Sequence, residues 1–123
     1  MARLFLAIAA VLGGLSVAGG AFASHALKEQ LSDRALEIFE TGAKYQMYHA
    51  LALLLVGMLL QNVPSPWLSA AGVAFIVGVA LFSGSLYALS LSDIKVLGAI
   101  TPLGGVAFLV GWGCLTAAAI TLK

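Results

Sequence analysis

The stretch Leu4–Ser24, LFLAIAAVLGGLSVAGGAFAS, contains no charged side chain. An α-helix rises about 1.5 Å per residue, so a helix of this length reaches roughly 30 Å. That distance matches the thickness of the hydrocarbon core of a lipid bilayer. The stretch therefore predicts a helix that spans a membrane.

The same stretch shares two features with a secretory signal peptide. Arg3 precedes it, and Ala21-Phe22-Ala23 matches the small-x-small pattern of a cleavage site. Its apolar run, however, is longer than the usual signal-peptide core of about 7–15 residues. The pairs Gly13-Gly14 and Gly19-Gly20 also suit close contact between helices. We therefore expect a retained membrane helix rather than a cleaved leader.

The composition of the whole chain supports a membrane location. Of 123 residues, 62% are hydrophobic and 9% are charged, whereas soluble domains have about 45–50% apolar and about 25% charged residues. The net charge of +1 and the lack of a basic stripe argue against nucleic acid as a partner. Cys114 is the one cysteine, and one thiol forms no internal disulfide. We expect a single membrane domain over residues 1–123, in the inner or plasma membrane.

Three further apolar stretches predict spans at about 45–60, 68–91 and 96–122, beside the first at about 4–24. Short polar turns at 61–66 and 92–95 join them. In lipid every backbone polar group must be satisfied internally, and these stretches do not alternate in polarity as barrel strands do. The predicted fold is therefore all-α, an integral membrane antiparallel four-helix bundle.

The segment between the first and second spans carries most of the charged residues. Ser32 is a candidate N-cap, and Leu31 is placed to pack against Leu36. Apolar residues then recur at helical spacing, with charged residues between them. We predict an amphipathic interfacial helix at about 32–43, bent at Gly42 into the second span.

The positions of basic residues give a weak prediction of orientation. Loops one and three carry Lys28, Arg34, Lys44 and Lys95, against Arg3 and Lys123 at the two termini. Because cytoplasmic loops are enriched in lysine and arginine, the count favours loops one and three on the cytoplasmic side.

Polar residues within the predicted spans gather at the end of the bundle that carries loop one. The spans place His49, Tyr87 and Thr101 roughly 6–8 Å below the boundary, with His25 just above them and the other members on faces set by helical spacing. The cluster comprises His25, Tyr45, Gln46, His49, Ser83, Ser85, Tyr87 and Thr101.

Two interpretations of this cluster stay open. Such side chains often form hydrogen bonds that join membrane helices, but ionisable groups in a membrane also mark ligand or proton sites. His49 is the sharpest functional candidate, because imidazole changes charge near physiological pH. His25 is expected to cap or anchor the loop.

No catalytic, cofactor or metal site emerges from the sequence. His25 and His49 lack a third strong metal ligand, and a bis-histidine haem would require both to face one open core. No carboxylate accompanies the serines of the spans, and the glycine pairs lie in apolar stretches where phosphate does not bind. We therefore expect no catalytic residue, no cofactor and no metal.

Four motifs together are characteristic of a known family. They are Gly20-Ala21-Phe22-Ala23-Ser24-His25-Ala26-Leu27, the run from Phe39 to Leu53 (FETGAKYQMYHALAL), Leu81-Phe82-Ser83-Gly84-Ser85-Leu86-Tyr87, and Ile100-Thr101-Pro102-Leu103-Gly104-Gly105. In these motifs the chain resembles the small bacterial membrane proteins of the YwdK/YgdD-like family, domain of unknown function 423. Members more usually have Gly-Ala where this chain has Ala23-Ser24. The resemblance implies four spans and no particular activity.

Three function classes remain at this point. The first is a non-enzymatic accessory or assembly factor that binds lipid or another membrane protein. The second is an oligomeric channel or transporter for a small solute or proton, which would use the residues around His49 and would need a homo-oligomer to enclose a path. The third is an enzyme acting on a lipid or quinone at the interface, with His49 as acid or base. We favour the first.

Overall fold

The computed structural model describes residues 1–122, and its elements are helical throughout. The chain runs through α1 (Ala2–Phe22), the π-helical turn η1 (Ala23–Leu27), α2 (Asp33–Leu60), α3 (Pro66–Gly78), the π-helical turn η2 (Val79–Ser83), α4 (Gly84–Ser92), the 3₁₀ turn η3 (Lys95–Ala99) and α5 (Thr101–Thr121).

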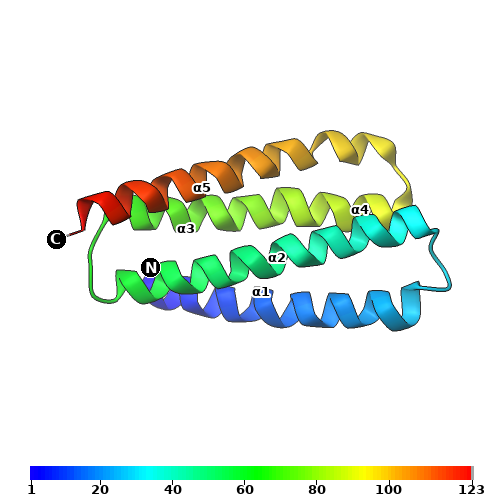
Figure 1. The fold of residues 1–123 in the computed structure, drawn as a ribbon, viewed down its shortest axis with the longest axis horizontal. Helices are drawn as coiled ribbons and strands as arrows, with labels where there is room; N and C mark the ends of the chain where they lie inside the picture. The colour runs from blue at the N-terminus through cyan, green and yellow to red at the C-terminus, as the bar shows by residue number, and fades with distance from the viewer. Residues whose placement is uncertain (123) are drawn as a thin grey trace.

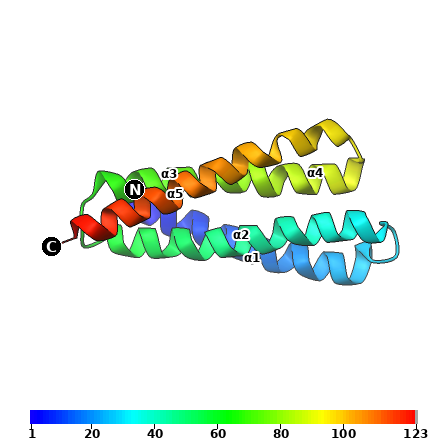
Figure 2. The same cartoon turned by 45° about the horizontal axis from the view of Figure 1, so that its top comes forward.

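These elements form four long antiparallel helices, as predicted (Figure 1). The four apolar helices contain 26, 28, 27 and 27 residues, which gives each about 40 Å, close to the full thickness of a bilayer with its headgroup layers. The prediction of an all-α, four-span membrane protein is confirmed. The two views place α1 beside α2 and α5 beside α3 (Figures 1 and 2).

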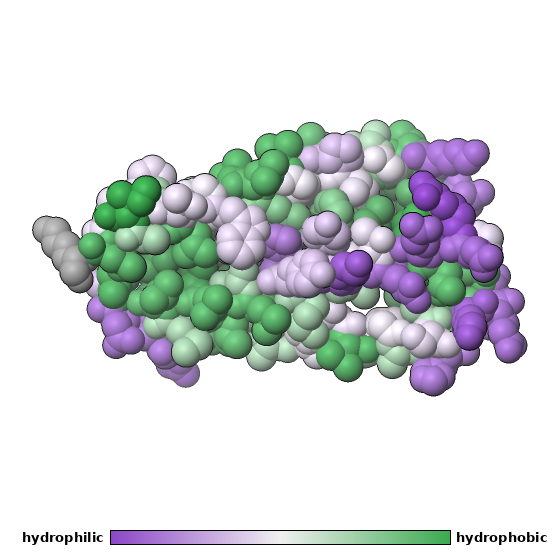
Figure 3. Space-filling view, in the orientation of Figure 1, coloured by the Kyte–Doolittle hydropathy of each residue, from purple (hydrophilic) through white to green (hydrophobic). Residues whose placement is uncertain are grey.

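The surface has the polarity expected of a protein surrounded by lipid. Hydrophilic residues gather at the end that carries loops one and three, and apolar residues cover most of the remaining visible face (Figure 3). Large apolar side chains point outward from α5, where Leu109 is 72% exposed and Ile120 is 78% exposed. In water such a face would be unstable, whereas in lipid it needs no cover.

Local sequence signals set the helix starts. Ser32 has extended backbone angles, and its Oγ accepts a hydrogen bond from the Ala35 N–H at 3.1 Å, so the predicted N-cap is confirmed. Ser65 caps α3 in the same way, with Pro66 following it in the first turn.

The amphipathic segment differs from its prediction. Residues 33–43 are helical, but they are the beginning of α2, which runs without interruption from Asp33 to Leu60. Gly42 does not bend the chain. It is buried against α4 and the end of η2, its carbonyl accepting a hydrogen bond from Ser83 Oγ at 2.7 Å with the Tyr87 ring beside it. Packing against these neighbours keeps the segment within the bundle instead of as a separate helix on the membrane surface.

Phenylalanine rings pack directly against glycines of the third and fourth spans. A Cβ atom added to Gly72 would lie 2.2 Å from the Phe5 ring, and one added to Gly78 would lie 2.3 Å from the Phe108 ring. Gly111 receives Phe75 in the same manner, at 2.5 Å. The absence of a side chain at these positions therefore lets α1 approach α3, and α3 approach α5, closely, as small residues do in membrane proteins.

Two adjacent glycines at the start of α5 provide a matched test of this packing. A Cβ at Gly104 would lie 2.3 Å from the backbone nitrogen of Phe82, whereas a Cβ at Gly105 would meet nothing within 4 Å. We expect Gly104→Ala to destabilise the protein by about 1–3 kcal/mol, because backbone cannot move aside as a side chain can. Gly105→Ala should be neutral or slightly stabilising. Unfolding in detergent measures both, and equal effects would contradict this packing.

Candidate functional site

Gln46 lies at the centre of the polar cluster and joins three helices. It is 4% exposed on α2. Its Nε2 donates to the carbonyl of Leu12 on α1 at 2.7 Å, and its Oε1 accepts from the Tyr87 hydroxyl on α4 at 2.6 Å. Both ends of the amide are thereby engaged, so Gln46 links α1, α2 and α4.

Two buried serines bind the backbone of α2 one turn before Gln46. Ser16 Oγ on α1 donates to the Ala43 carbonyl at 2.6 Å, and Ser83 Oγ in η2 donates to the Gly42 carbonyl at 2.7 Å. A helical carbonyl has a second lone pair available for such a bond. The serines therefore attach α1 and η2 to adjacent positions of α2.

His49 occupies the next turn of α2 and is 5% exposed. Its Nδ1 lies 2.8 Å from the Tyr45 carbonyl, and its Nε2 accepts a hydrogen bond from Trp112 Nε1 at 3.1 Å. The imidazole stacks on the Phe108 ring with centroids 3.5 Å apart and planes 7° apart. Because indole is only a donor and a carbonyl only an acceptor, these contacts select the neutral Nδ1–H tautomer.

Sequence reasoning did not identify three members of the site, Ser16, Phe108 and Trp112. The second span was predicted to begin at Tyr45, which put His49 near the membrane boundary. The structure places His49 sixteen residues after Asp33, about 24 Å along α2, where it meets the middle of α5. The available signal was the i, i+4 spacing of Phe108 and Trp112, which puts both rings on one face of α5.

Ser85 and Thr101 form a separate pair between α4 and α5. Their hydroxyl oxygens lie 2.6 Å apart, and Ser85 Oγ also donates to the Phe82 carbonyl at 3.0 Å. The Phe82 ring contacts the rings of Phe108 and Tyr45, both of which stack on His49.

The two remaining predicted site residues lie toward the surface. Tyr45 is 38% exposed, and its ring stacks on His49 with centroids 6.4 Å apart. His25 is exposed in η1 and takes no part in the hydrogen bonds that join the other cluster residues of the described chain. The structure therefore gathers five of the eight predicted residues along α2 and at its contacts with η2 and α4, keeps a second pair between α4 and α5, and leaves His25 apart. The five are Tyr45, Gln46, His49, Ser83 and Tyr87, and the pair is Ser85 and Thr101.

The arrangement uses its polar atoms to hold helices together. Within residues 1–122, every fully buried side-chain nitrogen or oxygen has a hydrogen-bond partner. Over the same residues, no three His, Cys, Asp or Glu side chains stand close enough to hold a metal ion. Of the two interpretations of the cluster, the geometry favours hydrogen bonds between helices.

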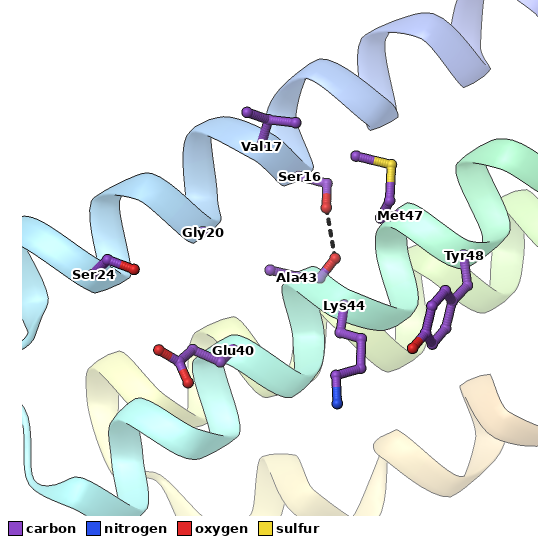
Figure 4. A pocket seen from close by; sticks show the side chains of 9 residues that line it. All are labelled: Ser16, Val17, Gly20, Ser24, Glu40, Ala43, Lys44, Met47 and Tyr48. Carbon is purple, nitrogen blue, oxygen red and sulfur yellow. Dashed lines mark hydrogen bonds between the residues drawn. The ribbon is translucent and has the colours of Figure 1, made fainter.

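A hollow of about 430 Å³ opens on the outside of the bundle between α1 and α2 (Figure 4). We call it the α1–α2 groove. Glu40 and Lys44 extend from α2 in different directions at this groove, and a single hydrogen bond, from Ser16 to Ala43, joins the residues drawn (Figure 4). The groove is lined by Ser16, Val17, Gly20, Ser24, Glu40, Ala43, Lys44, Met47 and Tyr48.

Comparison with known proteins shows relatives along the whole chain. Residues 19–105 match the model of the family described as "Protein of unknown function (DUF423)". The chain is 43% identical to the UPF0382 membrane protein YwdK of Bacillus subtilis, over 96% of this chain and 97% of that protein. It is 40% identical to the UPF0382 inner membrane protein YgdD of Escherichia coli K12, over 98% and 92% respectively. No solved structure matches the chain.

The bond between Tyr87 and Gln46 predicts coupled stability. We expect Tyr87→Phe to destabilise the bundle, because it leaves the Gln46 oxygen without its donor. A double-mutant cycle with Gln46→Leu should give a coupling energy of about 0.6–1.7 kcal/mol, the range for hydrogen bonds between membrane helices. Thr116→Val, at an exposed threonine whose hydroxyl bonds to the Trp112 carbonyl of its own helix, is the control. If the effects of Tyr87→Phe and Gln46→Leu on the free energy of unfolding are additive, the hydrogen bond between Tyr87 and Gln46 is excluded.

The contacts of His49 predict its tautomer. Nitrogen-15 NMR of the labelled imidazole should show a protonated Nδ1 and an unprotonated Nε2. Trp112→Phe removes the donor to Nε2 but keeps an aromatic ring, so it should shift the Nε2 resonance more than that of Nδ1. A protonated Nε2 in the unsubstituted protein would contradict the contact with Trp112.

Proposed function

The chain belongs to the membrane-protein family of unknown function DUF423, and we propose that it is a non-enzymatic accessory protein that holds a transmembrane helix of another membrane protein in the α1–α2 groove. The observation that carries this proposal is the contrast between the interior and the outer surface. Inside, within residues 1–122, the fully buried polar atoms of the side chains have hydrogen-bond partners in the bundle. Outside, the groove offers unfilled space.

The interior supports a role as a rigid framework. Catalysis or transport would require a polar group free to meet a substrate, or a path along which a solute moves. Gln46 and His49 instead use both of their polar ends within the bundle. Stacking of His49 against Phe108 further fills the space around the imidazole.

The groove supports contact with a helix. Ser16 and Gly20 on α1 and Ser24 in η1 follow one another at intervals of four, which is the small-residue spacing that lets two membrane helices approach closely. A Cβ at Gly20 would meet nothing within 4 Å, so this part of the groove is open. Van der Waals packing into such a surface is the main source of helix association in lipid.

The charged rim of the groove supports selectivity for a protein. Glu40 and Lys44 are both exposed there and carry opposite charges. A partner helix with a basic and an acidic residue near its end would pair with them, and wrong partners would be repelled. We therefore expect the partner to present a charged pair just beyond its apolar stretch.

Photo-crosslinking in cells tests this proposal. A photoreactive amino acid replaces Val17, which lines the groove and is 63% exposed. In the control it replaces Val11, which lies elsewhere on α1 and is 60% exposed. We expect a discrete protein adduct from position 17 and none from position 11. The adduct should also vanish when Gly20→Leu fills the groove and persist with Gly14→Leu, since both glycines have open space around them.

Three outcomes would overturn the proposal. An adduct of twice the mass of the chain would identify a second copy as the occupant. Adducts with lipid alone, or a protein adduct that survives Gly20→Leu, would show that the groove does not hold a partner helix.

A further inference from the structure

A second hollow, of about 320 Å³, lies at the charged end of the bundle, between the beginning of α2 and the end of α4. We infer that it binds the headgroup of an anionic phospholipid, phosphatidylglycerol. Its volume falls at the lower end of the range for small-molecule sites, about 300–1,000 Å³. We call it the headgroup pocket, lined among others by Ser32, Arg34, Ile38, Leu89, Asp93 and Lys95.

Charges from two distant parts of the chain meet at this pocket. Arg34 comes from the first turn of α2, and Lys95 comes from the loop after α4. With the single carboxylate of Asp93 they give the lining a net charge of +1. A phosphodiester carries one negative charge, and a guanidinium can bind two of its oxygens at once while an ammonium supplies a point charge. The pocket therefore complements a lipid phosphate of net charge −1.

The backbone of Asp93 holds the acidic side of the pocket in place. This residue ends α4 in the left-handed conformation, with φ 57°, and its N–H donates to the Leu89 carbonyl at 2.8 Å. Aspartate is one of the few residues other than glycine that adopt this conformation readily. The turn brings the carboxylate and Lys95 to the same rim.

Apolar surroundings favour a lipid over a dissolved anion. Ile38 and Leu89 form part of the pocket wall below the charged rim. On either side of the loop, Leu91 is 56% exposed and Val96 is 70% exposed. Such side chains belong at the edge of a bilayer, where a headgroup meets its acyl chains. Inorganic phosphate would use the charged rim only.

The carboxylate of Asp93 selects among anionic lipids. The glycerol of phosphatidylglycerol carries two hydroxyl groups, which can donate hydrogen bonds to this carboxylate. Phosphatidylserine would bring an ammonium that can donate to Asp93, but on the same carbon also a second carboxylate that Asp93 repels, and phosphatidylcholine has no headgroup donor and no net charge. Phosphatidylglycerol is therefore the preferred occupant. This inference is independent of the α1–α2 groove and of a protein partner there.

Native mass spectrometry of the full chain in detergent tests the pocket. The probes are phosphatidylglycerol, phosphatidylserine and phosphatidylcholine with identical acyl chains, together with inorganic phosphate. We expect preferential retention of phosphatidylglycerol. Arg34→Gln and Lys95→Gln should each weaken its binding about fivefold, the factor expected for one basic residue near anionic lipid. Lys28→Gln removes an exposed charge from the same end outside the pocket and should change binding by less than about twofold.

A fourth variant tests the role of the carboxylate. Asp93→Asn keeps the size of the side chain and tolerates the left-handed backbone, so it should reduce the preference for phosphatidylglycerol over phosphatidylserine. If Arg34→Gln, Lys95→Gln and Lys28→Gln weaken the binding of phosphatidylglycerol equally, the attraction is a non-specific one to the charged surface, and the inference is overturned. Displacement of the lipid by excess inorganic phosphate, or equal retention of the three lipids, would overturn it as well. Thermal unfolding of each variant checks that the fold is retained.

Discussion

The close approach of glycine and phenylalanine is the contact on which the rest of the structure depends. In lipid, helices gain little from hiding apolar side chains, because the surrounding acyl chains are equally apolar. Association then requires dense packing, which the rings of Phe5, Phe75 and Phe108 achieve by lying on Gly72, Gly111 and Gly78. These contacts bring α3 and α5 together and place α1 against α3.

α2 is the element around which the polar interior is organised. It receives the serine hydroxyls of its neighbours at Gly42 and Ala43 and contributes Gln46 and His49 in the following turns. Each of these polar groups would be costly in an apolar interior without a partner. Because these polar groups bond to neighbouring helices, they are not available to bind other molecules. We therefore expect other molecules to bind at the outer surface, where the α1–α2 groove and the headgroup pocket lie.

The sequence predicted the class of fold well and the site only in part. Four apolar stretches required four helices, and Ser32 was recognisable as a cap because its side chain acts locally. The sequence did not predict that α2 runs without interruption from residue 33 to residue 60. The charges of residues 33–44 suit a separate surface helix as well as the first turns of a long helix. Contacts of Gly42 with Ser83 and Tyr87 favour the long helix. For the same reason the contact of His49 with Trp112 was missed. Pairing of a particular ring with a particular glycine depends on helix rotation, which composition does not specify.

Rings packed on glycines hold α1 against α3 and α3 against α5. The free energies of unfolding of Gly72→Ala, Phe5→Val and the double variant, measured in the same detergent, test this packing. If the claim holds, Gly72→Ala alone is strongly destabilising, and removal of the Phe5 ring relieves its clash with the new methyl group. The double variant is then more stable than the sum of the two single effects. Strict additivity would contradict the account.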